Sequence, residues 1–108
     1  MVQSSTAAVF RALGDASRLE IVTRLANQPQ TATDLVAPLG MTLQAVRKHL
    51  AVLEGAGLVT TQKRGRVRLC RLQTGPLQDA EAWMQSRTKL WQARLGALGD
   101  LFEKDKKP

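Results

Sequence analysis

The sequence is poor in the side chains from which disulfides, metal sites and catalytic centres are built. Its 108 residues contain one cysteine, Cys70, and one histidine, His49. A single cysteine cannot form an intramolecular disulfide, which excludes a disulfide-stapled secreted scaffold. One thiol and one imidazole cannot supply the several ligands that zinc or similar metals require. No paired carboxylates, nucleophile–base set or phosphate-binding loop is present either, so we expect no metal, no other cofactor and no catalytic residue.

Long apolar runs and acidic residues are also scarce. No stretch reaches the roughly 18 apolar residues that a membrane span needs, and the N-terminus lacks a basic region followed by an apolar run. We therefore expect no membrane partner and a cytoplasmic location. Nine acidic residues stand against sixteen lysines and arginines, which leaves a net charge of +7. That excess favours a nucleic acid over a membrane surface as partner, although solubility alone could also explain it.

Length and apolar content together predict one folded domain over residues 1–108. Apolar residues make up 44% of the chain, which excludes a disordered protein. Turn residues divide the chain into a helix at 5–13, a second helix after Asp15, a short helix near 31–40, a fourth helix from Thr42 to about Ala56, a hairpin and a last helix at 76–103. We expect the core at 15–72 and a frayed tail at 104–108. Three helices followed by a β-ribbon predict a mainly α winged helix-turn-helix fold with a two-stranded wing.

The second helix is expected to start at its cap Asp15 and to carry one apolar face. Arg18 and Arg24 are expected on its more exposed side. The face itself is read from four residues at helical spacing: Leu19, Val22, Leu25 and Ala26.

The short helix and its successor have helix-turn-helix spacing. Thr31 is a candidate cap for the short helix, and Pro38 is expected to shorten or kink its last turn. Gly40 and Met41 form the turn, and Thr42 caps the next helix. The inward stripe of that helix comprises Val46, His49, Leu50 and Leu53. We expect His49 to be a packed or hydrogen-bonded structural residue, because it has no second histidine to act with.

The opposite face of the fourth helix is polar at its N-terminal end. Glutamine can read adenine, arginine can read guanine, and threonine suits a phosphate or a thymine methyl. In a helix-turn-helix, this end enters the major groove. The candidate DNA-binding residues are Thr42, Leu43, Gln44, Arg47 and Lys48. An ordinary solvated helix face stays open as the alternative.

The segment from Thr60 to Leu72 contains several cations and no acid. Threonine and valine dominate two runs on either side of a turn near Lys63 to Arg66, which predicts a β-hairpin. Arginines at the tip of a β-ribbon can reach the minor groove or its flanking phosphates. The candidate wing contacts are Lys63, Arg64, Arg66 and Arg68. An edge hairpin protected from aggregation by its charges is the alternative.

The last helix carries an apolar seam with coiled-coil spacing over almost four heptads. Its apolar positions are Leu77, Met84, Trp91, Leu95, Leu98 and Phe102. This seam predicts a homodimer, with packing inside the same chain as the alternative. A two-fold dimer would present two recognition helices about one DNA turn apart, as a palindromic operator requires.

Taken in order, "LGDASRLEIVTRL", "TDLVAPLGMTLQAVRKHLAVLEGAGLV" and "KRGRVRLCRL" resemble the ArsR (ArsR/SmtB) family of bacterial winged-helix repressors. The resemblance covers about residues 6 to 104. It implies homodimers joined through the first and last helices, which places Phe10 in the interface, and repression from inverted-repeat operators. Arg47 replaces the family's usual serine.

The resemblance also bears on metals and effectors. Metal-sensing members carry a Cys-x-Cys-type motif in the third helix or Asp/His pairs along the last one, and neither is present here. The last helix is similar to that of a subgroup of ArsR-like repressors without metal ligands, and the effector stays unknown. A winged-helix module that docks an acidic protein partner is the alternative function.

Overall fold

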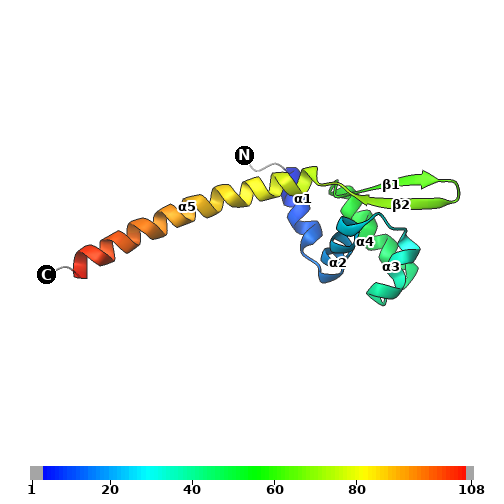
Figure 1. Cartoon of the computed structure of the whole chain (residues 1–108), viewed down its shortest axis with the longest axis horizontal. Helices are drawn as coiled ribbons and strands as arrows, with labels where there is room; N and C mark the ends of the chain where they lie inside the picture. The colour runs from blue at the N-terminus through cyan, green and yellow to red at the C-terminus, as the bar shows by residue number, and fades with distance from the viewer. Residues whose placement is uncertain (1–3, 107–108) are drawn as a thin grey trace.

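The computed structural model describes the backbone of residues 4–106 and the side chains of residues 5–101. Within that span the chain forms five helices and one antiparallel hairpin, in the predicted order. They are α1 (Ser4–Leu13), α2 (Ala16–Asn27), α3 (Ala32–Leu39), α4 (Leu43–Gly55), β1 (Val59–Arg64), β2 (Val67–Leu72) and α5 (Gly75–Lys106). The molecule measures 75 × 29 × 20 Å, because α5 extends away from the body on the side opposite to the hairpin (Figure 1). The mainly α winged helix-turn-helix prediction is confirmed.

The helix starts follow the capping residues that the sequence contains. Asp15 accepts a hydrogen bond from the Arg18 backbone N–H at 3.0 Å and begins α2. Thr31 forms a reciprocal capping box with Asp34 at the start of α3, and Thr42 accepts from the Ala45 N–H at 3.1 Å to begin α4. Each cap satisfies a backbone donor that the helix itself leaves free.

The prediction for the faces of α2 was right for Val22 and Leu25 and wrong for Leu19 and Ala26. Ile21 and Leu25 are the buried residues of this helix, whereas Leu19 is 49% exposed and Ala26 is exposed. The inward stripe runs through Arg18, Ile21, Val22 and Leu25, at i, i+3, i+4 and i+7. Arg18 therefore lies on the inward side, partly buried, and not on the exposed side as expected.

α3 and α4 are joined by a three-residue turn. Pro38 lies inside α3, and the helix ends one residue later at Leu39. Gly40 follows with φ 63°, and its N–H donates to the Val36 carbonyl at 2.9 Å. A left-handed residue at this position suits glycine, which has no Cβ. The turn directs α4 across α3 with its N-terminal end free.

The hairpin has the register predicted for a tight turn. Arg64 pairs with Val67, so the loop consists of Gly65 and Arg66, and Gly65 alone has a positive φ, 63°. That pattern is typical of a type II′ turn. At the other end, Cys70 exchanges both backbone hydrogen bonds with Gln30, at 2.8 and 3.1 Å. This bridge attaches β2 to the connection between α2 and α3.

One core holds these elements together. It draws fully buried side chains from every helix and from the base of the hairpin: Val9, Ile21, Leu35, Val46, Leu53, Leu58 and Ala80 are among them. α5 joins this core only through its first turns, and it continues as a helix to Lys106. Residues 107–108 of the tail that is expected to fray lie outside the described residues. No helix of the described chain is long and apolar enough to cross a membrane.

Candidate nucleic-acid interface

α4 separates its residues into a buried stripe and an exposed polar face. Val46, Leu50 and Leu53 are buried in the core. Around them the predicted contact residues point outward: Thr42, Gln44, Arg47 and Lys48 are exposed, and Leu43 is partly buried. These exposed side chains occupy the cap and first two turns of the helix, so that end is free to approach a partner.

The wing presents its cations to solvent. Every residue from Thr60 to Arg68 is exposed, which includes all four predicted wing contacts. Lys63 lies directly opposite Arg68 in the register. Like charges in that position destabilise a hairpin by repulsion, and a polyanion would remove the penalty. Arg71 differs from the others, because it is only partly exposed and its Nε is buried without a hydrogen-bond partner among the described residues.

The helix face and the wing share one concave surface. A cleft of about 750 Å³ lies between the start of α3, the exposed face of α4 and the hairpin. It brings Arg47 together with Arg66 and Arg68. The other predicted contacts, Lys63 and Arg64 on the wing and the first residues of α4, are not among the residues that line it.

Two acidic residues also line this cleft, and sequence reasoning missed them. Asp34 is held in the capping box of α3, and Glu54 accepts a hydrogen bond from the Thr61 hydroxyl. This bond joins the last turn of α4 to the first strand of the wing. Glu54 lies seven residues after Arg47, so the helical repeat alone could have placed both on one face. Its partner Thr61 could not be found that way.

The positive charge belongs mainly to this part of the molecule. Ten of the sixteen lysines and arginines precede residue 75, together with only four of the nine acidic residues. α5 and its tail are nearly balanced. A field concentrated on one end of the molecule attracts a polyanion to that end.

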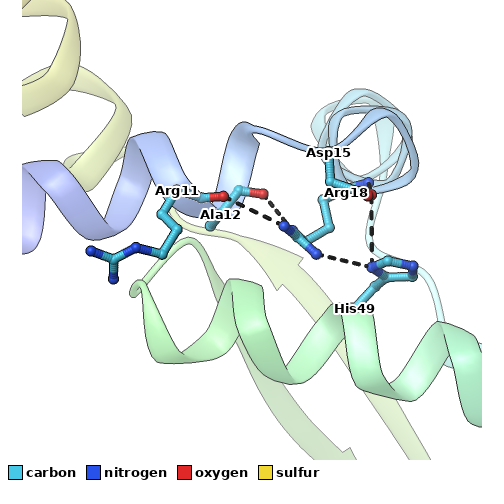
Figure 2. A network of polar contacts seen from close by, with 5 residues as sticks. All are labelled: Arg11, Ala12, Asp15, Arg18 and His49. Carbon is cyan, nitrogen blue, oxygen red and sulfur yellow. Dashed lines mark hydrogen bonds and ion pairs between the residues drawn. The ribbon is translucent and has the colours of Figure 1, made fainter.

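A polar cluster sits behind α4, on the side away from this face. His49 Nδ1 lies 3.2 Å from Arg18 Nη1 and 3.8 Å from Asp15 Oδ2 (Figure 2). The backbone N–H of Arg18 lowers the pKa of Asp15 by donating to its carboxylate, and the guanidinium charge of Arg18 adds to this. His49 is thus partly buried and in hydrogen-bond contact with Arg18, which agrees with its expected place on the inward side of α4.

The second chemically reactive side chain, Cys70, lies in the base of the wing. It is 3% exposed, and burial raises the pKa of its thiol, so the protonated form is favoured. Within the described part of the chain, no three His, Cys, Asp or Glu residues come close enough together to hold a metal ion.

The residues predicted for a dimer interface fall into two groups. Phe10 and Leu77 pack against the core of their own chain, and the Phe10 ring meets the Trp83 ring edge-on with centroids 5.5 Å apart. The second group is 45–60% exposed along α5 and comprises Met84, Trp91, Leu95 and Leu98. The Phe102 side chain lies outside the described residues.

A three-helix core, a helix-turn-helix turn and a basic two-stranded wing define a winged helix-turn-helix protein. A family model described as a helix-turn-helix domain matches residues 6–62. The chain is also 36% identical over 86 residues to YuzN of Bacillus subtilis (strain 168), described as an uncharacterized HTH-type transcriptional regulator. That alignment covers 72% of this chain and 94% of YuzN.

Two solved structures share the fold over most of their length. An ArsR-like transcriptional regulator from Rhodococcus sp. RHA1 is 34% identical, with a TM-score of 0.79 over 91% of this chain and 92% of that one. The crystal structure of an ArsR family transcriptional regulator is 35% identical, with a TM-score of 0.76 over 82% of this chain and 98% of that one. The chain belongs to the ArsR family of winged helix-turn-helix transcriptional regulators.

Proposed function

We propose that the protein acts in the cytoplasm as a homodimeric repressor that binds an inverted-repeat operator and does not sense a metal. The proposed DNA-binding surface rests on one observation: Arg47 of α4 lines the same cleft as Arg66 and Arg68 of the wing. A helix face beside a basic ribbon matches the two parts of a duplex that a winged helix contacts, the major groove and the neighbouring backbone.

The exposed residues of α4 and those of the wing have different parts in this proposal. Gln44 and Arg47 lie in the first turns of α4, where side chains reach base edges, and Thr42 and the free backbone N–H groups of the helix start face a phosphate. Lys63 and Arg64 near the wing tip neutralise phosphates. Base contacts set the sequence preference, whereas phosphate contacts contribute affinity for any duplex.

The dimer rests on α5. Its exposed apolar residues continue the side of the helix that packs on the core at Leu77 and Ala80. The helix itself extends past the body (Figure 1). A second copy would cover them and would place the two α4 helices about 34 Å apart, one turn of the operator. Because the described residues bring no group of metal ligands together, the proposed repressor should hold its operator equally in zinc and in a chelator.

The experiment compares four single variants on two duplexes: an operator fragment selected from the source genome by the purified protein, and a random duplex of equal length. Gln44→Ala and Arg47→Ala should lose roughly 1–3 kcal/mol on the operator alone. Lys63→Ala and Arg64→Ala should weaken both duplexes alike and reduce the slope of log K against log salt by about 0.9 each.

Lys89→Ala is the matched control, since it removes one exposed cation on α5, remote from the cleft. It should leave both affinities nearly unchanged. Equal losses on operator and random DNA for all four variants would remove the base-reading assignment. A failure to retain any duplex, with a salt-insensitive complex formed by an acidic protein instead, would replace the proposal by a protein-docking function.

A further inference from the structure

Arg18 connects three helices through its guanidinium group. Its Nε donates to the Ala12 carbonyl at 2.6 Å and its Nη2 to the Arg11 carbonyl at 3.4 Å, both at the end of α1. Its Nη1 faces His49 Nδ1 of α4 at 3.2 Å (Figure 2). The helix that packs against α5 is thereby joined to the recognition helix by one side chain.

The imidazole has a second candidate partner. Asp15 Oδ2 lies 3.8 Å from the same Nδ1 atom. A guanidinium can only donate, so Arg18 needs Nδ1 to be unprotonated, whereas the carboxylate of Asp15 attracts Nδ1 once it carries a proton. The two contacts require opposite protonation states of one ring nitrogen.

We propose that Arg18 and His49 are positioning residues for operator binding, and that protonation of His49 exchanges its partner from Arg18 to Asp15 and lowers operator affinity. The inference rests on the proposed function, because it assumes that α4 reads the operator. Loss of the Arg18 bond releases α4 from the end of α1, while the new pairing with Asp15 keeps the fold intact. Asp15 is available for that exchange because its pKa lies below its ordinary range, so it stays ionised in weak acid.

Few other charges face this site. α1 contributes backbone carbonyls, and the side chain of Arg11 points away from the cluster (Figure 2). Asp34 of α3 is held in its own capping box, and Glu20 and Arg24 of α2 pair with each other at 2.9 Å. The four predicted wing contacts lie toward the far end of the hairpin, whereas Arg71 is nearer its base. On α4 itself the exposed charged residues are Arg47, Lys48 and Glu54. Arg18 and Asp15 are thus the two groups that compete for Nδ1 of His49.

The composition of the chain makes this competition for His49 measurable. Imidazole is the side chain that ordinarily changes charge between pH 5 and 8, and the chain contains a single histidine. Burial raises the pKa of the other reactive group, Cys70, which moves it further from this range. Substitution of His49 therefore removes every imidazole from the chain, and a comparison with wild type isolates its part in any pH dependence of DNA binding.

The test measures the dissociation constants of wild type and His49→Asn at about pH 7.5 and about pH 5.5, at equal ionic strength. Asparagine retains a neutral acceptor near the position of Nδ1 but takes up no proton. The probes are the selected operator fragment and the random duplex. Wild type should lose about fivefold or more in operator affinity at the lower pH, the lower end of typical coupling between linked sites. His49→Asn should change by less than twofold.

Random-duplex binding separates positioning from general electrostatics. Protonation adds a positive charge, so the affinity of wild type for random DNA should hold or rise as its operator affinity falls. A flat wild-type operator profile, or a fall of equal size in His49→Asn, overturns the inference while the proposed function stands. A wild-type protein that binds neither duplex at either pH overturns both. If the variant does not fold, the two wild-type profiles still test the inference, because an equal fall on operator and random duplex overturns it.

Discussion

Trp91 provides the sharpest test of the α5 interface. It belongs to α5, the helix that extends past the body (Figure 1), and 60% of its surface is exposed. A tryptophan buries about 150–250 Å² when fully covered, so about 90–150 Å² of this side chain is free to meet a partner. At ~25 cal/mol per Å², covering that area stabilises the dimer by about 2–4 kcal/mol for each protomer.

A two-fold interface contains the residue twice. Full coverage therefore contributes about 4–8 kcal/mol, and coverage of half the area about 2–4 kcal/mol. At 1.4 kcal/mol for each factor of ten, Trp91→Ala should raise the dimer dissociation constant by about thirtyfold or more. Sedimentation equilibrium over a range of protein concentrations measures this constant directly.

Leu19→Ala is the control for Trp91→Ala. Leu19 is also a large, exposed apolar residue, at 49%, but it belongs to α2. Its substitution should leave the dissociation constant unchanged within about twofold. A change of less than about threefold for Trp91→Ala, or equal changes for both variants, would refute the assignment of the interface to the exposed stripe of α5.

Five further substitutions test the local geometry. Asp15→Asn keeps a capping oxygen but removes its charge. The Arg18 backbone N–H lowers the pKa of Asp15, so wild type should have the higher free energy of unfolding in urea. This difference should be complete above about pH 4 and should disappear as the pH falls through the lowered pKa. Thr61→Val removes the hydrogen bond between the wing and α4, so it should weaken binding to every duplex in a gel-shift titration. Glu54→Gln keeps an acceptor for Thr61 but removes a charge that repels phosphates, so it should tighten binding in the same assay. A Cβ added at Gly65 would meet no other atom, but an alanine is strained at φ 63°, so Gly65→Ala should destabilise the protein by about 1–2 kcal/mol in thermal unfolding. Gly96→Ala inside α5 should stabilise the protein slightly in the same assay.

Local signals in the sequence were sufficient to place the elements. Asp15, Thr31 and Thr42 cap the three helices whose starts they predict, since each has a side-chain oxygen that can satisfy a free N–H. Glycines mark the ends, with Gly40 and Gly57 at positive φ after α3 and α4. These interactions span only a few residues, so they can be predicted without knowledge of the tertiary structure.

The faces of α2 could not be predicted in the same way. Leu19 was assigned to the core because it is apolar, and Arg18 to the surface because it is charged. The structure reverses both, because Ala12 and Arg11 offer backbone carbonyls at the end of α1 that satisfy the guanidinium. Those acceptors come from a different helix, so the sequence of α2 does not contain the information that decides its own orientation.

The candidate DNA-binding site also has one part that the sequence predicts and another part that depends on the tertiary structure. The exposed polar residues of α4 follow from helical spacing, and the wing cations follow from a run of residues without an acid. The meeting of Arg47 with Arg66 and Arg68 depends on how the hairpin is attached, through Gln30 and Cys70, to the rest of the fold. That attachment is a contact between distant segments, and neither segment predicts it alone.

Arg18 and His49 each occupy an inward position that an apolar residue could fill, and they contact each other there. Partly buried polar groups cost stability unless they are satisfied, and a well-packed apolar pair would hold the helices together as well or better. Apolar contacts are non-directional, however, and residues such as Val46 and Leu50 would tolerate some sliding of α4 over α2. A guanidinium held by two carbonyls and aimed at one ring nitrogen permits far less, because hydrogen bonds weaken steeply away from their preferred angles. The polar pair therefore contributes orientation more than stability, which is the property that a helix reading base edges requires.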